Sequence, residues 1–252
     1  MSISIQETDD VVVLTVERPP ANALEVGILR SLVEAVETFA DDPPGALVIA
    51  GCDPFFSAGV DLKAVTSYGT AELREMVAGI NAMALGVYGL SCPVVGAITG
   101  HAVAGGLVLA VCTDIRVASN CGRYGLTEIK VGVGYPQAAI GVIRAELAPH
   151  AARVLALGNH LHDAAECHRL GVFDEIAAPG DVLPRSLEIA RELAAYSPEM
   201  YARTKRDLRS DALETLRTAA AQDQLADGAA WLEDAAYLAR ARSALGVSSN
   251  TR

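Results

Sequence analysis

The chain of 252 residues is long enough for one large domain or two small ones, and half of its residues are hydrophobic while a fifth are charged, which excludes a disordered protein. The net charge of −11, from 31 acidic and 20 basic side chains, offers no basic footprint for nucleic acid. The start of the chain, MSISIQETDD, lacks the apolar stretch of a secretory signal, and the five cysteines show no C-x-x-C pairing. We therefore expect a cytoplasmic protein.

The first part of the chain alternates between short apolar strands and helices. Strands are predicted at Val11–Val16 and Ala46–Ala50, which are β-branched or fully apolar runs between Asp, Pro and Gly clusters. Helical periodicity indicates a helix at Glu25–Ala40 and a second one at Thr70–Leu90, capped by its first residue. The loop Gly51–Gly59 is apolar for a surface turn, as is often found where a loop lines a site. The alternation predicts an α/β architecture with helical crossovers.

The rest of the chain is organised around the stretch Pro93–Asp114. A strand at Val94–Thr99 ends in glycine and leads into an apolar helix near Gly105, which leaves backbone N–H groups unpaired at the helix start. With the helix dipole, these donors suit an anion or a developing oxyanion. The glycine spacing resembles a phosphate-binding loop, but Gly106 and Leu107 replace the Lys and Ser/Thr that such a loop needs. From the residues alone, a packing role for the glycines stays open beside an anion site.

No Asp, Glu, Lys or Arg occurs from Val77 to Thr113, a length that would suit a membrane span. However, Pro93, His101 and a glycine every few residues interrupt this run. A buried helix, a buried strand and a second buried helix are the better interpretation, so we expect no membrane contact.

After a further strand at Ile115–Ala118, helical patterns dominate, with one strand candidate at Val172–Ile176. The predicted helices are Ala138–Leu157, Ala164–Leu170, Leu183–Tyr196, Pro198–Leu208 and Ala212–Leu245. The last of these is amphipathic and carries Trp231 and Leu232 among alanines, which indicates a face buried against other helices. We expect a core of residues 1–195 and a C-terminal helical region of residues 196–252, with no flexible linker between them.

Several segments together resemble the enoyl-CoA hydratase/isomerase (crotonase) superfamily, in the order and spacing of that family. They are Glu17–Leu24 (ERPPANAL), Phe56–Leu62 (FSAGVDL), Gly100–Leu107 (GHAVAGGL), Cys112–Ala118 (CTDIRVA) and Tyr124–Gly132 (YGLTEIKVG). The resemblance covers essentially the whole chain. It implies a spiral of ββα turns with a C-terminal helical trimerisation region, often paired into hexamers. It also implies an acyl-CoA thioester substrate, with no cofactor or metal because coenzyme A is part of the substrate.

The resemblance places the oxyanion hole at the backbone N–H groups of Ala58 and Gly105, which would hold the thioester oxygen. Each such donor typically supplies about 3–4 kcal/mol of transition-state stabilisation. Glu128 would be the acid/base group, in apolar company where the pKa of a carboxyl rises. Further substrate contacts are expected at these positions: Asn22, Ser57, Gly59, Val60, Asp61, Val108, Tyr135 and Pro136.

Other polar residues near these segments have a structural interpretation. Asp61 is expected to cap or brace the donor loop, His101 to be a structural turn residue, and Asp114 to mark the entry of a strand. Scattered cations are usually solvated, so candidates for contacts to the CoA phosphates stay unranked. These candidates are Lys63, Lys130, Lys205 and Arg206.

The residue at position 108 separates the possible reactions. Hydratases of the family carry a second glutamate three residues beyond the second oxyanion glycine, where this chain has Val108, and valine can neither hold a water nor transfer a proton. One carboxylate can move a proton between C2 and C4, as in the Δ3,Δ2-enoyl-CoA isomerases that this site resembles. We therefore expect an enoyl-CoA isomerase. The alternatives are a hydratase whose water is held by another group, and an acyl-CoA-binding protein with little catalysis.

Overall fold

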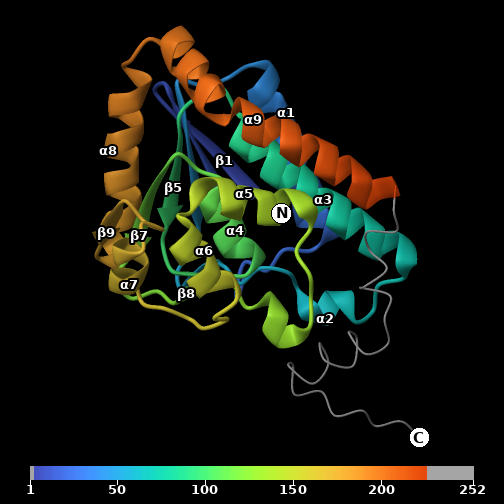
Figure 1. Cartoon of the computed structure of the whole chain (residues 1–252). Helices are drawn as coiled ribbons and strands as arrows, with labels where there is room; N and C mark the ends of the chain where they lie inside the picture. The colour runs from blue at the N-terminus through green and yellow to red at the C-terminus, as the bar shows by residue number, and fades with distance from the viewer. Residues whose placement is uncertain (1–2, 226–252) are drawn as a thin grey trace, which may run out of the picture.

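A six-stranded sheet runs through the computed structural model, which describes residues 3–225 (Figure 1). Its strand order is β1-β2-β3-β5-β7-β9, with β1 antiparallel to β2 and all other neighbours parallel. The strands are β1 (Ile3–Thr8), β2 (Val11–Val16), β3 (Ala46–Gly51), β5 (Val94–Ile98), β7 (Ile115–Ser119) and β9 (Glu175–Ala177). β3 and β5 are buried along their whole length, as expected for parallel strands covered on both faces.

A second, smaller sheet supplies the second strand of each repeating ββα unit. The short strands β4 (Phe55–Ser57), β6 (His101–Val103) and β8 (Tyr124–Gly125) pair in parallel, in that order. Each follows a strand of the main sheet along the chain: β4 follows β3, β6 follows β5, and β8 follows β7. Helical segments then lead to the next turn, so the chain forms the predicted spiral of ββα turns.

The helices cover the two faces of the main sheet. They are α1 (Val26–Asp41), α2 (Leu62–Val65), α3 (Thr70–Gly89), α4 (Gly105–Val111), α5 (Gln137–Glu146), α6 (Pro149–Ala156), α7 (Ala164–Arg169), α8 (Val182–Ala194) and α9 (Pro198–Leu225), with 3₁₀ turns η1 (Glu128–Val131) and η2 (Pro179–Asp181). In Figure 1, α8 flanks one side of the sheet, whereas α9 runs beside α3 on the other. Within residues 3–225, no helix is long and apolar enough to cross a membrane.

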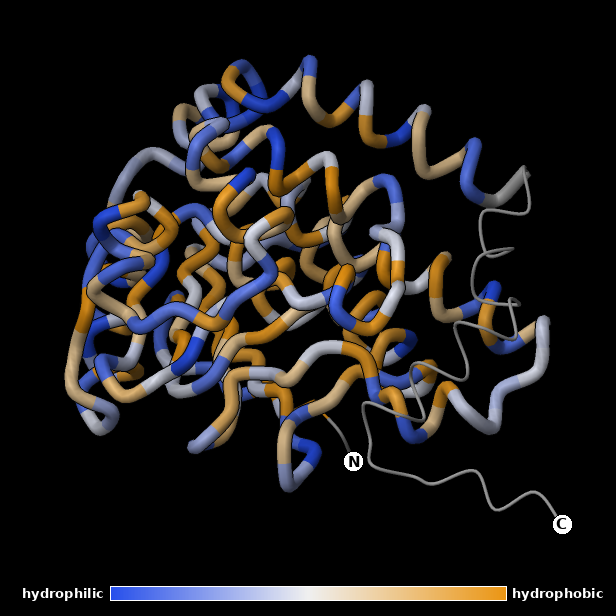
Figure 2. Tube along the Cα trace, turned by 60° about the horizontal axis from the view of Figure 1, so that its bottom comes forward, coloured by the Kyte–Doolittle hydropathy of each residue, from blue (hydrophilic) through white to orange (hydrophobic). Residues whose placement is uncertain are grey.

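Alternate residues of the central strands serve two separate cores. Val13 and Val48 pack with α8, whereas their neighbours Leu14 and Leu47 pack in the larger core with α1 and α3. Figure 2 shows apolar and polar residues alternating along α9. The apolar face of α9 contributes Leu213, Leu216 and Ala220 to the larger core. The described part of the C-terminal helical region therefore packs directly on the spiral.

The structure corrects three predictions of helices. The predicted helix at Ala138–Leu157 is interrupted at Leu147 and Ala148 and forms α5 and α6. Gly69, and not Thr70, occupies the N-cap position of α3, and its N–H donates to the side chain of Glu72 at 2.8 Å. α9 is one continuous helix from Pro198 to Leu225, where two helices were predicted. Its middle is fixed by buried charges, since Arg209 pairs with Asp114 at 2.9 Å. Trp231, Leu232 and the rest of the predicted tail lie outside the described residues.

Candidate active site

An apolar pocket lies between α3, α4, α5 and the loop after β4. It is lined by Ala58, Val60, Leu62, Met76, Val77, Ile80, Ala104, Gly105, Val108, Thr127, Glu128, Val131, Val133, Gly134, Tyr135, Pro136 and Ala139. The structure thus brings together most of the predicted site residues, from three separate segments of the chain. Among the residues that the structure describes, only Thr127, Glu128 and Tyr135 contribute polar side chains to this lining. Chemistry in the pocket therefore depends on these three side chains and on the backbone.

The start of α4 presents a free backbone donor to the pocket. The N–H groups of Leu107 and Val108 donate to the carbonyl of Ala104 at 2.9 and 3.1 Å, so the helix uses its amides from Leu107 onward. The N–H of Gly105 has no acceptor within residues 3–225. A Cβ at Gly106 would lie 2.2 Å from the carbonyl oxygen of Ser57, so only glycine allows the helix to begin this close to β4.

A second free donor lies on the loop after β4, where Gly59 takes a positive φ of 77°. The N–H of Leu24 donates to the carbonyl of Gly59, and the N–H of Asp61 donates to the carbonyl of Leu24, each at 2.8 Å. These two bonds form a parallel bridge between Leu24 and Val60, in which the N–H of Val60 points away from Leu24. In the described part of the chain, the N–H of Val60 has no acceptor.

The Val60 and Gly105 donors border the same point of the pocket. A Cβ built on Gly105 would lie 3.9 Å from the nitrogen of Val60, and a Cβ built on Gly59 would lie 2.9 Å from the nitrogen of Gly105. Two unpaired N–H groups converging on one point are the arrangement that stabilises an oxyanion. The start of α4 adds the positive end of the helix dipole to this point.

The predicted role of Ala58 does not agree with this geometry. The N–H of Ala58 donates to the carbonyl of Ala21 at 2.9 Å and is therefore directed into the protein. The donor belongs instead to Val60, which the sequence had assigned only to substrate contact. Ala58 itself still lines the pocket.

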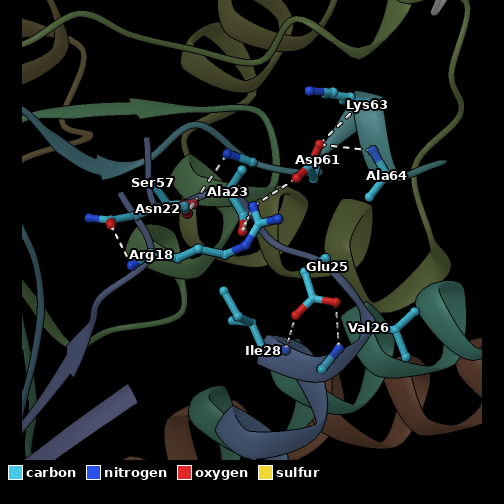
Figure 3. Close-up of polar contacts among 12 residues, drawn as sticks. Arg18, Asn22, Ala23, Glu25, Val26, Ile28, Ser57, Asp61, Lys63 and Ala64 are labelled. Carbon is cyan, nitrogen blue, oxygen red and sulfur yellow. Dashed lines mark hydrogen bonds and ion pairs between the residues drawn. The ribbon is translucent and has the colours of Figure 1, made fainter. Parts of the chain in front are cut away.

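Two further residues predicted to contact substrate, Asn22 and Ser57, hold the loop after β4 in place, and Figure 3 shows both side chains. The Asn22 amide donates to the carbonyl of Phe55 at 2.7 Å, and the Ser57 hydroxyl donates to the carbonyl of Asn22 at 2.8 Å while accepting from the N–H of Gly59 at 3.1 Å. Both side chains are buried and lie outside the pocket lining. Asn22, Ser57 and Gly59 are therefore structural, and the prediction of direct substrate contacts is corrected for them.

Asp61 caps α2, as its structural interpretation predicted, and does not line the pocket. Its carboxylate accepts from the N–H groups of Lys63 and Ala64, both at 3.0 Å, and pairs with Arg18 at 2.7 Å (Figure 3). Burial alone would raise the pKa of Asp61, but the Ala64 N–H and the Arg18 guanidinium hold it below its ordinary value. The Arg18–Asp61 ion pair therefore joins the loop that follows β2 to the loop that follows β4.

Glu128 supplies the carboxyl group of the pocket. It begins η1 and is only 8% exposed. Burial raises the pKa of this carboxyl to about 7, although the Tyr135 hydroxyl and the N–H groups of Glu128 and Thr127 act in the opposite direction. Its Oε2 has no hydrogen-bond partner among the described residues. A carboxyl that titrates near neutral pH can both accept and return a proton.

The remaining candidates lie elsewhere. The Nδ1 of His101 accepts from the N–H of Arg123 at 2.9 Å, which makes it structural, although it begins β6 and is not in a turn. Lys205 is buried and donates to Asp114 and to the carbonyl of Cys92 at 2.8 and 2.9 Å. Lys205 is therefore removed from the unranked candidates for a CoA phosphate contact, whereas the structural role of Asp114 is confirmed. Three phosphate candidates are exposed: Lys63, Lys130 and Arg206.

A ββα spiral that presents two free backbone donors beside one buried carboxyl defines an enzyme that polarises a carbonyl group and moves a proton. The chain belongs to the enoyl-CoA hydratase/isomerase family, because the model of that family matches residues 6–229. This finding confirms the superfamily predicted from the sequence and identifies acyl-CoA thioesters as the class of substrate.

Relatives of known structure or name agree on the fold and differ in reaction. Carnitinyl-CoA dehydratase of Salmonella arizonae is 30% identical over 217 residues, which cover 82% of this chain and 82% of that protein. The crystal structure of probable enoyl-CoA hydratase EchA3 of Mycobacterium tuberculosis superposes with a TM-score of 0.85 and 31% identity, covering 91% of this chain and 98% of that one. An apo structure of the same protein, described as an enoyl-CoA isomerase, has a TM-score of 0.81 and 31% identity, covering 88% and 96%.

Proposed function

We propose that the protein moves the double bond of an enoyl-CoA between C3 and C2. The observation that supports this proposal is that, within residues 3–225, Glu128 carries the one carboxyl group that lines the pocket. Val108, where a hydratase would carry its second glutamate, is buried in the same lining and offers no polar atom. A site with one proton carrier suits a reaction in which one proton leaves one carbon and returns to another.

The reaction begins when the Glu128 carboxylate removes a proton from C2 of a 3-enoyl thioester. The C2–H bond breaks, and its electron pair moves into a dienolate whose negative charge rests on the thioester oxygen. The N–H groups of Val60 and Gly105 stabilise this charge, and removal of such a donor typically costs about 3–4 kcal/mol. The protonated Glu128 then delivers the same proton to C4, so a C4–H bond forms and the double bond moves to C2–C3.

A second candidate, hydration of a 2-enoyl-CoA or the reverse dehydration, is favoured by one observation. Carnitinyl-CoA dehydratase of Salmonella arizonae, a relative that is 30% identical over 82% of its length, is named as a dehydratase. In this alternative, a water would be held between Glu128 and another polar group of the pocket, of which Thr127 and Tyr135 are available. A catalytically weak acyl-CoA-binding protein remains the third possibility.

A panel of thioesters distinguishes the three functions. The purified protein is incubated with 3-enoyl-, 2-enoyl- and 3-hydroxyacyl-CoA, and the products are analysed by mass and by the position of the double bond. Isomerisation leaves the mass unchanged and moves the double bond, whereas hydration adds the mass of one water. Binding without turnover of any of the three substrates would leave the third function.

The homotrimer or hexamer and the cytoplasmic location are further parts of this proposal. The trimer is supported by the family membership and by the amphipathic C-terminal helix expected from the sequence. Light scattering at micromolar concentration tests it, and a monodisperse monomer would contradict it.

A further inference from the structure

We propose that Tyr135 is a positioning residue, whose hydroxyl donates a hydrogen bond to the Glu128 carboxylate, keeps it ionised and aims it at the substrate. The inference rests on the proposed function only in taking Glu128 as the base. It starts from two buried oxygen atoms. The hydroxyl of Tyr135 and the Oε2 of Glu128 are both buried without a hydrogen-bond partner in the described chain, and both residues line the pocket.

Buried polar atoms without partners are uncommon, because no hydrogen bond offsets the free energy lost when they leave water. Where they do occur, a ligand or a change of ionisation can supply the partner. Apart from Thr127, the other described residues of the lining have no polar side chain. A carboxylate accepts hydrogen bonds and a phenol donates one, so the two groups are complementary when Glu128 is ionised.

The backbone that follows Tyr135 is held by contacts to two other helices, α3 and α9. Tyr135 lies two residues before α5, whose first turn is capped by side chains from other helices. The N–H of Gln137 donates to Asp223 of α9 at 2.7 Å, and the N–H of Ala138 donates to Asn81 of α3 at 2.9 Å. Asn81 and Asp223 are in turn joined at 3.1 Å. This anchoring limits the motion of the tyrosine, so its hydroxyl can hold the carboxyl in one direction.

The directions in which the pKa values of the two groups are shifted fit this arrangement. Burial raises the pKa of Glu128, and among side chains it is the Tyr135 hydroxyl that lowers it again. Burial and the neighbouring Glu128 raise the pKa of Tyr135, so the hydroxyl stays protonated and remains a donor at neutral pH.

The charged groups on the elements around the pocket have other partners or face solvent. Asp61 is paired with Arg18, the Glu72 carboxylate accepts from the N–H of Gly69, and Lys130 is exposed on η1. None of these groups contributes to the shift of the Glu128 pKa. Within the described chain, Tyr135 is therefore the side chain whose removal should change the ionisation of Glu128.

The test compares Tyr135→Phe with the matched variant Tyr68→Phe. Tyr68 lies outside the pocket lining, where its hydroxyl accepts from the N–H of Val26 at 3.4 Å. The carboxyl groups of full-length protein labelled with ¹³C-glutamate are titrated by NMR, and the Glu128 signal is identified by its loss in Glu128→Gln. Tyr135→Phe should raise the pKa of Glu128 by about one to two pH units, whereas Tyr68→Phe should leave it unchanged.

In parallel, the rate of isomerisation is measured across pH. In Tyr135→Phe, the midpoint of the acidic limb of kcat should move upward by the same one to two units, so that the rate at neutral pH falls about tenfold or more and recovers at high pH. KM should change little. An unchanged Glu128 pKa, or an equal loss of rate at every pH, would overturn the positioning role.

Two further arms keep the outcomes separate. If the wild-type protein does not isomerise 3-enoyl-CoA but the NMR shift appears, the proposed function fails and the role of Tyr135 stands. If Tyr135→Phe does not fold, as judged by circular dichroism, incorporation of 3-fluorotyrosine at position 135 keeps the ring and makes the hydroxyl a stronger donor. The pKa of Glu128 should then fall below the wild-type value, and an unchanged value would overturn the inference.

Discussion

The N–H of Ala58 is joined to the carbonyl of Ala21 by a hydrogen bond of 2.9 Å. Together with the bridge between Leu24 and Val60, this bond holds the segment after β2 against the segment after β4. The Ala58–Ala21 bond also determines which backbone N–H of the loop after β4 is available to a ligand. Because the amide of Ala58 is occupied, the pair of donors offered to a thioester oxygen consists of Val60 and Gly105.

The role of Gly105 as donor can be tested at the first position of α4. Proline is tolerated there, but it removes the N–H, so Gly105→Pro should lower kcat at least about a hundredfold. Gly105→Ala is the matched control, because it keeps the N–H and its Cβ would meet Leu24 at an ordinary 3.5 Å. Steady-state kinetics, acyl-CoA binding and circular dichroism are compared. Near-normal turnover in a folded Gly105→Pro would remove this residue from the mechanism.

Replacing the base should separate catalysis from binding. Glu128→Gln keeps the shape of the side chain but cannot accept a proton, so double-bond migration should fall by about two to four orders of magnitude. Calorimetry should show that the affinity for an acyl-CoA ligand is retained. The opposite pattern, substantial hydration of a 2-enoyl-CoA that survives in Glu128→Gln, would show that both the reaction and the base are wrongly assigned.

The same variant makes a prediction about stability. The pKa of Glu128 is raised from 4.5 to about 7 in the folded protein. Between these values the folded protein binds more protons than the unfolded chain, so the contribution of Glu128 to the free energy of unfolding falls as the pH rises through this window. Glu128→Gln should therefore be more stable than the wild type at pH 8, by up to about 3 kcal/mol, with no such gain at pH 4. Urea denaturation at both pH values checks this, and an equal difference at both would contradict it.

A buried charge cluster should make α9 sensitive to one substitution far from it in sequence. The Asp114 carboxylate is paired with Lys205 at 2.8 Å and Arg209 at 2.9 Å, and both cations are only 8% exposed. Asp114→Asn leaves them without this partner and should lower the free energy of unfolding by about 3–5 kcal/mol. Asp207→Asn, on the exposed side of α9, should change it by less than about 0.5 kcal/mol. Denaturant titration that ranks the two variants equally would show that the cluster does not anchor the helix.

The parts of the fold that could be predicted from the sequence are those with a local pattern. β3 and β5 are continuous apolar runs, and the amphipathic helices follow their periodicity. The strand β1 was missed because its exposed residues are mostly polar, and β4, β6 and β8 have only two or three residues, too few for any periodicity.

In the site, Glu128 and Gly105 lie in the pocket as expected. Each stands among apolar residues in the sequence, and these neighbours already indicated a buried position. The choice between Ala58 and Val60 could not be made from the sequence, because it depends on a bridge to Leu24 that only the fold creates. The burial of Lys205 could not be predicted from the sequence either, because its partner Asp114 lies 91 residues away in the chain.

The cap that Asp223 provides to α5 constrains the length of α9, which lies far from α5 along the chain. Along α9, roughly four helical turns separate Arg209, which is paired with Asp114, from Asp223, which accepts from the N–H of Gln137. Both contacts need their side chains on particular faces of the helix, and one inserted or deleted residue would rotate Asp223 by about 100°. Substitutions on the outer face of this segment are thus tolerable, whereas changes in its length are not, because they would move Asp223 away from the N–H of Gln137, two residues after Tyr135 of the pocket.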